Sequence, residues 1–275
     1  MPVMDLETNM AASNSIPAAP LATFAWMWGV PIVAMIALAI LLSSGGNIEL
    51  FKLLNPFMAQ ASDTLWSHLT TLGDTSLALL FILPLFGRRS VLVWQFFLAA
   101  ILATFWSHGM KNLFATLRPP AVLHEGSYHL IGPMFEHNSF PSGHTTTIFV
   151  LAGLICLQHL DNKLKLAVLV LAFFVGLSRI ACGVHWPVDV LGGMFGGWLS
   201  AVAAVWLSRR WQGGLNIWFQ RILALLVTLS AVWSIFYYDN GLPGTWLFQF
   251  TITAICLGLS IKGQYRLFRT DKLSI

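Results

Sequence analysis

The chain has 275 residues, of which 57% are hydrophobic and only 9% are charged. A soluble globular domain carries about 25% charged residues, so this composition excludes an ordinary soluble domain and indicates an integral membrane protein. The net charge of +4 is small and spread along the chain, which argues against a nucleic-acid partner. The three cysteines have no paired spacing, and we interpret them as small buried hydrophobes: Cys156, Cys182 and Cys256.

The first sixty residues change character twice. Residues 1–20 are rich in Ala, Pro, Ser and Asn and contain no Lys or Arg. A signal peptide needs a basic segment before its apolar core, so we predict a retained, disordered tail. After the first apolar run, Ile48, Phe51 and Leu54 recur every three residues within 47–60. This spacing predicts a short helix that lies on the membrane surface.

Apolar segments of spanning length make up most of the remaining chain, and we predict an all-α bundle of about eight membrane helices. The predicted spans are 22–43, 63–86, 91–110, 143–160, 165–181, 188–208, 219–237 and 246–261. The second span is the least regular: Asp63 can cap a helix that runs through Trp66, His68 and Gly73-Asp74 into the apolar 75–86 stretch. A long polar loop, 112–141, separates the third span from the fourth.

The basic residues give these spans an orientation. With eight spans, ten basic residues outside the motifs below fall on one side of the membrane. They are Arg88, Arg89, Lys163, Lys165, Arg209, Arg210, Lys262, Arg266, Arg269 and Lys272. Loops rich in Lys and Arg face the cytoplasm, so we predict that both termini are cytoplasmic. The segments 44–62, 112–141, 182–187 and 238–245 then lie on the opposite side, with Lys52 as the isolated basic exception.

The sixth span carries two overlapping pairs of small residues four positions apart. They are Gly192, Gly193, Gly196 and Gly197. Small residues at this spacing let two helix backbones approach closely in a membrane, so we predict tight packing against a neighbouring helix.

The first of three unusual segments joins the third span to the polar loop. Lys111 and Arg118 are seven residues apart, so a continuing helix would place both on one stripe. Pro119 favours departure of the chain from the helix. Considered alone, two basic residues at a membrane boundary are most often anchors that reach toward the interface.

The second segment, Pro141-Ser142-Gly143-His144, opens the fourth span. Ser142 is a good helix N-cap, and the first backbone N–H groups of the helix point outward. A helix N-terminus with a glycine for close approach can bind an anion. Considered alone, the segment is an ordinary helix start.

The third segment, Ser178 to Asp189, lies between two apolar runs and contains Arg179 and His185. His185 and Asp189 are four residues apart, so the carboxylate can accept a hydrogen bond from one ring nitrogen. The other nitrogen then keeps a lone pair for nucleophilic attack. The alternative is a capping aspartate beside an incidental histidine.

Together the three segments place basic residues, two histidines, a carboxylate and a helix N-terminus at one membrane face. Cations and backbone N–H groups suit a phosphoryl group, and two histidines suit a nucleophile and an acid. Other ionisable residues are predicted to be solvated in the loop: His124, Glu125, His129, Glu136 and His137. His68, Asp74 and His108 could line the cavity or make helix caps and interhelical hydrogen bonds.

The combined pattern Lys-x6-Arg-Pro, Pro-Ser-Gly-His and Ser-Arg-x5-His-x3-Asp resembles the three-part signature of the type 2 phosphatidic acid phosphatase (PAP2) superfamily. Every signature position is met within 111–189. The resemblance implies a six-span core, so we predict a catalytic membrane domain at 21–208. The segment 209–275 would add two further spans and a basic cytoplasmic tail.

The resemblance also implies roles for the residues. His185 would form a phosphohistidine and be oriented by Asp189, while His144 would protonate the leaving oxygen and then help to activate water. The phosphate oxygens would be held by Lys111, Arg118, Ser142, the Gly143 amide and Arg179. No metal or other cofactor is required by this chemistry. Because it needs a neutral nucleophile and a protonated acid, it predicts a bell-shaped pH–rate profile.

The predicted function is a metal-independent phosphatase that acts on a lipid phosphate or pyrophosphate at the periplasmic face of a bacterial inner membrane. Polyprenyl pyrophosphate, phosphatidylglycerol phosphate, phosphatidic acid and the phosphates of lipid A all stay open as substrates. A lipid phosphotransferase is the main alternative. Others are a non-catalytic lipid transporter on the same scaffold and a phosphatase for soluble esters. The sequence does not specify an oligomeric state.

Overall fold

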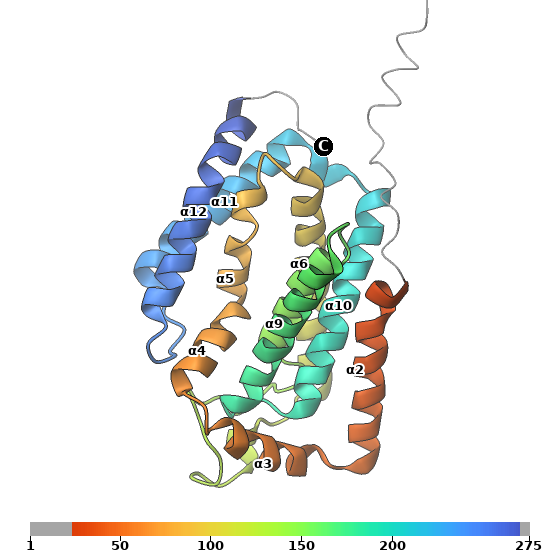
Figure 1. Ribbon diagram of the computed structural model, residues 1–275, viewed down its shortest axis with the longest axis vertical. Coiled ribbons are helices and arrows are strands. Elements are labelled where there is room, and N and C mark those ends of the chain that lie inside the picture. Colours follow the sequence, from red (N-terminus) through yellow and green to blue (C-terminus); the bar gives the residue numbers. More distant parts are fainter. Residues whose placement is uncertain (1–23, 270–275) are drawn as a thin grey trace, which may run out of the picture.

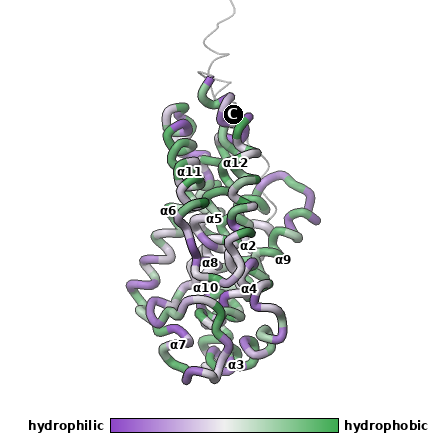
Figure 2. Tube along the Cα trace, turned by 90° about the vertical axis from the view of Figure 1, so that its left-hand side faces the viewer, coloured by the Kyte–Doolittle hydropathy of each residue, from purple (hydrophilic) through white to green (hydrophobic). Residues whose placement is uncertain are grey.

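The computed structural model describes residues 24–269; the predicted tail at 1–20 and Lys272 lie outside them. Within this range every regular element is a helix, which confirms the all-α prediction. The long helices run side by side, and α3 lies across one end of the bundle (Figure 1). The long helices are mostly hydrophobic, whereas the connections are mixed in polarity (Figure 2).

Six helices are long and apolar enough to cross a membrane. They are α2 (Phe24–Ser44), α6 (Ser90–Phe114), α9 (Asn162–Ala181), α10 (Pro187–Arg210), α11 (Ile217–Tyr237) and α12 (Trp246–Arg269). The shorter helices are α3 (Asn47–Met58), α4 (Asp63–Leu72), α5 (Thr75–Leu80), α7 (Pro119–Val122) and α8 (Gly143–Cys156). Two 3₁₀ turns, η1 (Leu83–Leu85) and η2 (Gly213–Leu215), complete the elements of residues 24–269.

The predicted second and fourth spans differ most from regular spanning helices. The second was predicted as one helix through Gly73-Asp74, and this is wrong: it is a bent pair with an angle of 52°, and it would bring the number of spans in the described residues to seven. The bend follows from Asp74, whose Oδ1 accepts from the backbone N of Ser76 at 2.8 Å and so caps a new helix, α5. The fourth, α8, has 14 residues, whereas a full crossing needs about 20.

The centre of the bundle is the contact between α8 and α10. The glycines of α10 are buried there, and a Cβ on Gly193 would lie 2.7 Å from the Cβ of Thr145. At Gly197 a Cβ would collide with the backbone oxygen of Thr146. The predicted tight packing is therefore confirmed. It also brings the start of α8 against the start of α10, where the backbone N of Ser142 donates to the Asp189 carbonyl at 2.9 Å.

The remaining helices surround this centre. The predicted helix at 47–60 is confirmed as α3, which buries Phe51 and exposes Leu53. Its Asn55 side chain donates to the carbonyls of Ile180 and Ala181 at 2.9 and 3.2 Å and so fixes α3 against the end of α9. On the other side, α11 and α12 pack against each other and against α5. All three cysteines are free and buried, as predicted.

Candidate active site

The three unusual segments meet at one end of the bundle, which we call the loop end. It is formed by the connections 115–142, 182–186 and 238–245, together with α3. Each site residue sits at or near a helix terminus here. Lys111 lies in the last turn of α6, Ser142 caps α8, Arg179 lies in the last turn of α9, and Asp189 lies in the first turn of α10.

His185 and Asp189 form a buried pair between α9 and α10. The Nδ1 of His185 lies 3.2 Å from Oδ2 of Asp189, and the side chains are 2% and 1% exposed. The same oxygen accepts from the backbone N of Trp186 at 2.7 Å and from the Ser139 hydroxyl at 2.5 Å. Because the carboxylate oxygen accepts at Nδ1, that nitrogen carries the ring proton and Nε2 keeps its lone pair.

The charge state of His185 also suits a nucleophile. Burial lowers the pKa of His185 well below its usual range, and the positive charges of Arg118 and Arg179 lower it further. A lowered pKa keeps the imidazole neutral at physiological pH, with its lone pair available. The geometry therefore gives a neutral, oriented imidazole in a site surrounded by positive charge.

Lys111 and Arg118 do not lie on one continuous helix, as the predicted stripe required. The helix α6 ends at Phe114, and Ala115 has a left-handed backbone with φ of 44°. The chain then turns, so the prediction of one continuous stripe is wrong. Arg118 is instead held by backbone carbonyls. Its Nε donates to His137 O at 2.9 Å, and its two Nη atoms donate to Val184 O and Asn138 O at 3.4 Å.

Arg179 and Lys111 add two further cations. The Nη1 of Arg179 donates to the Thr70 hydroxyl at 2.5 Å, whereas its buried Nε has no hydrogen-bond partner within residues 24–269. The Nζ of Lys111 lies 3.9 Å from the position of a Cβ on Gly143. Across residues 24–269, no carboxylate lies within 4 Å of the charged nitrogens of Lys111, Arg118 or Arg179. Their charge is therefore available to an anionic ligand.

The start of α8 supplies Ser142, Gly143 and His144. Ser142 is fully buried, and its hydroxyl oxygen accepts from the backbone N of Thr145 at 3.4 Å, as expected for an N-cap. The His144 side chain is 28% exposed, and its Nε2 lies 3.8 Å from Oδ2 of Asp74. All eight predicted site residues are thus at the loop end, with the two histidines on different helix termini.

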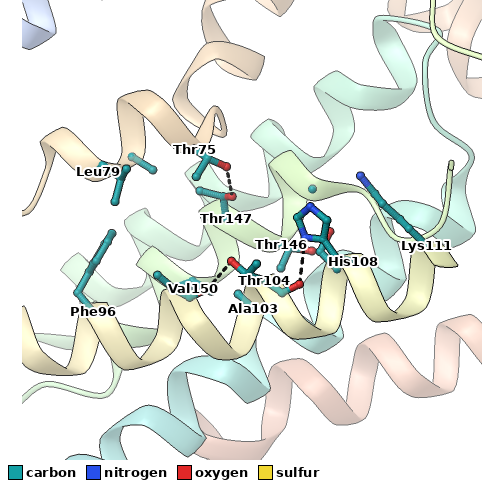
Figure 3. Close-up of a pocket in the computed structure, with 14 residues that line it drawn as sticks. Thr75, Leu79, Phe96, Ala103, Thr104, His108, Lys111, Thr146, Thr147 and Val150 are labelled. Carbon is teal, nitrogen blue, oxygen red and sulfur yellow. Dashed lines mark hydrogen bonds between the residues drawn. The ribbon is translucent and has the colours of Figure 1, made fainter. Parts of the chain in front are cut away.

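Two cavities reach this cluster from different directions. A polar cavity of about 230 Å³ is lined by Asp74, His144, Arg179, Val184, Tyr238 and Asn240, among others. An apolar cavity of about 240 Å³ has Lys111 and Gly143 at one end and continues between α5, α6 and α8. In Figure 3, Lys111 and His108 lie at the polar end of this cavity, and Phe96 and Leu79 lie at the other.

The other ionisable residues are arranged around the site. Four of the loop residues are exposed, as predicted: His124, Glu125, Glu136 and His137. The fifth, His129, contacts Asp63 at 2.8 Å. The ring of His68 packs against Phe248 instead of lining either cavity. No group of three His, Cys, Asp or Glu side chains in residues 24–269 is placed to hold a metal ion.

Three residues of the site were missed by the sequence reasoning. Ser139 donates to Asp189, Thr70 accepts from Arg179, and Tyr238 donates to Asp74 at 2.5 Å. None belongs to a recognisable motif. Thr70 and Tyr238 are also 109 and 164 residues distant from their partners along the chain, so no local spacing could have revealed them.

Comparison with known proteins identifies a family segment and several relatives. Residues 92–213 match the PAP2 superfamily. The putative undecaprenyl-diphosphatase YbjG of Escherichia coli (strain K12) is 29% identical over 194 residues, which cover 65% of this chain and 93% of that protein. The lipid A 1-phosphatase of Rhizobium etli is 38% identical over 72 residues, which cover 26% of this chain and 30% of that protein.

A solved structure is also similar in sequence. Aquifex aeolicus LpxE is 31% identical, and the alignment covers 58% of this chain and 94% of that one, with a TM-score of 0.49. The family segment includes all three signature motifs, at 111–119, 141–144 and 178–189. On the matched segment, the chain carries a PAP2 superfamily domain at residues 92–213.

Proposed function

We propose that this protein hydrolyses a lipid phosphate or diphosphate through a phosphohistidine on His185, without a metal ion. The observation that carries the proposal is the buried hydrogen bond between His185 Nδ1 and Asp189 Oδ2, which leaves Nε2 as the nucleophile. The charges of Arg118, Arg179 and Lys111 all act on His185, so a phosphate bound by them would lie beside it. These cations supply the charge stabilisation that the phosphoryl group needs in the transition state.

The reaction has two halves. In the first, Nε2 of His185 attacks phosphorus, the bond from phosphorus to the lipid oxygen breaks, and the His144 imidazolium protonates that oxygen. The imidazolium form of His185 is stabilised by Asp189. In the second half, His144 accepts a proton from water, whose oxygen attacks phosphorus. The P–N bond breaks, its electron pair returns to Nε2, and inorganic phosphate leaves.

The apolar cavity supports a lipid substrate. It begins at Lys111 and Gly143 and continues between hydrophobic side chains of α5, α6 and α8 (Figure 3). A lipid whose phosphate binds at Lys111 could therefore place its hydrocarbon tail in this cavity, toward the bilayer. The relatives are named for undecaprenyl diphosphate and lipid A as substrates. We propose a substrate of the same chemistry, with phosphatidic acid and phosphatidylglycerol phosphate as further candidates.

The test uses purified protein in detergent and four lipids: polyprenyl diphosphate, lipid A, phosphatidylglycerol phosphate and phosphatidic acid. With the preferred ³²P-labelled lipid, rapid quenching should trap an acid-labile, alkali-stable phosphoenzyme. His185→Ala should abolish this label and reduce turnover by at least about 10⁴-fold. The control is His124→Ala, which removes an exposed loop histidine and should be neutral. Label transferred to an added acceptor lipid would identify a phosphotransferase, and full activity of His185→Ala would refute the proposal.

We also propose that the loop end faces the periplasm and that both chain termini are cytoplasmic. Support comes from the basic residues outside the motifs, which gather at the opposite end, for example Arg88, Lys163 and Arg210. Because the native cysteines are buried, an introduced cysteine can be labelled selectively. In bacterial spheroplasts, an impermeant maleimide should label Glu125→Cys and spare Gln212→Cys; the reverse pattern would contradict this orientation.

A further inference from the structure

The connection between α11 and α12, residues 238–245, reaches the loop end from outside the segment that matches the family. We call it the α11–α12 turn; it lies beside α4 in Figure 1. The Nδ2 of Asn240 donates to the Thr71 hydroxyl of α4 at 3.0 Å. Leu242 packs against the 131–133 segment. A Cβ added to Gly132 would lie only 2.7 Å from Cδ2 of Leu242. The turn is thus attached on both sides of the polar cavity.

Tyr238, the first residue of this turn, contacts the break between α4 and α5. Its hydroxyl donates to Oδ2 of Asp74 at 2.5 Å, while Oδ1 of the same carboxylate caps α5. Burial and the neighbouring Asp74 raise the pKa of Tyr238 well above its usual value, so the hydroxyl stays protonated and remains a donor. Both carboxylate oxygens are therefore fixed in position.

The fixed carboxylate lies beside His144. Its Oδ2 is 3.8 Å from Nε2 of the imidazole, within ion-pair distance. The approach is close because position 73 has no side chain: a Cβ on Gly73 would lie 2.9 Å from His144 O and from Val175 Cγ1. Asp74, His144 and Tyr238 all line the polar cavity.

We propose that Asp74 and Tyr238 are positioning residues for His144, so that the hairpin of α11 and α12 completes the active site. The inference rests on the proposed function, in which His144 is the proton donor. A carboxylate at this distance stabilises the imidazolium and holds its orientation, and the tyrosine hydroxyl holds the carboxylate. The hairpin is therefore part of the catalytic unit in this chain.

The test is a set of double-mutant cycles on the lipid that the four-lipid panel shows to be hydrolysed fastest. Tyr238→Phe should lower kcat about 10-fold and Asp74→Asn about 100-fold, within the range for proton transfer by a positioned group, with little change in KM. In a His144→Ala background neither substitution should lower kcat further, because residues that act through one group are not additive. Measured with ³²P-labelled substrate, even the slow background remains quantifiable.

The matched control is Tyr237→Phe, which removes the same hydroxyl from a side chain that is 73% exposed. Its activity should equal that of the parent. Asp74→Asn also alters a helix cap, so Tyr238→Phe, which leaves the cap intact, decides the question if Asp74→Asn fails to fold. The proposal is overturned if Tyr238→Phe matches Tyr237→Phe, or if its loss persists unchanged in the His144→Ala background. Activity retained by His185→Ala would instead defeat the proposed function itself.

Discussion

The two ends of the bundle bury polar groups in different ways. At the end opposite the loop end, several buried groups are neutral amides and hydroxyls that pair with one another, and the ammonium of buried Lys165 lies over the Trp26 ring. The Nε2 of Gln95 donates to the Ser208 hydroxyl at 3.2 Å, and Gln158 donates to Gln95 Oε1 at 3.3 Å. At the loop end the buried groups include two arginines, Arg118 and Arg179, which bind neutral oxygens in place of carboxylates.

The contrast separates a structural role from a functional one. Neutral pairs such as Gln95 and Ser208 satisfy the hydrogen bonds that burial would otherwise leave unmade, and they need no ligand. A buried cation without a carboxylate partner is costly, because its charge is removed from water without compensation. At the loop end, a phosphate dianion would provide that compensation. Substitutions at the two ends should therefore affect different measurements.

Among the substitutions that test this contrast, the largest effect should follow from Arg179→Ala. Arg179 is 5% exposed, its Nε has no partner among residues 24–269, and its guanidinium lines the polar cavity beside His144. Loss of a charged donor aimed at the transition state costs roughly 10²–10³ in kcat. Thr70→Val, which removes the hydroxyl that Arg179 contacts at 2.5 Å, should produce a smaller loss of the same kind. Steady-state hydrolysis in detergent checks both, and normal activity of Arg179→Ala would contradict this description of the loop end.

The fold was largely accessible from the sequence because its main signals are local. Apolar runs long enough for a bilayer identify the helices, and the glycines of α10 indicate close packing against a neighbouring helix, which the structure identifies as α8. The break at Gly73-Asp74 was missed, because the sequence was interpreted as one helix through these residues, whereas Asp74 caps a second helix. The end of α12 was also missed, because its hydrophobicity decreases after residue 261 while the helix continues to Arg269. Charged residues of this kind can extend a helix beyond the apolar region.

The site was accessible only in part, for a different reason. Motif spacing identified His185 and Asp189. They are four residues apart at the start of α10, so their contact is local in the sequence. The same reasoning failed between Lys111 and Arg118, because a left-handed residue, Ala115, ends the helix between them. Contacts between distant segments, such as that of Tyr238, depend on how the helices pack and have no local signal.

After Arg179→Ala, the next largest effect is expected on the pH dependence of kcat/KM. Burial and the charge of Arg118 lower the pKa of His185, so the nucleophile stays neutral and kcat/KM should fall only well below pH 6.5. Arg118→Gln removes a positive charge, which allows the pKa of His185 to rise and moves the acidic limb to higher pH. Lys163→Gln, at the opposite end, should leave that limb unchanged. These profiles are measured on the parent and on each variant; a limb that does not move with Arg118→Gln would show that this charge does not act on the nucleophile.

The smallest effect on activity should come from Gln95→Leu. The substitution removes the hydrogen bonds of Gln95 to Ser208 and Gln158, but each partner keeps another bond, to Val205 O and to Leu154 O. The expected cost is roughly 1 kcal/mol of stability, seen as a modest decrease in the thermal midpoint in detergent. Turnover per folded molecule should not change, since no charge near the phosphate site is altered. A loss of turnover comparable to that of Arg179→Ala would show that the two ends are coupled, and that buried neutral pairs in this bundle also serve the reaction.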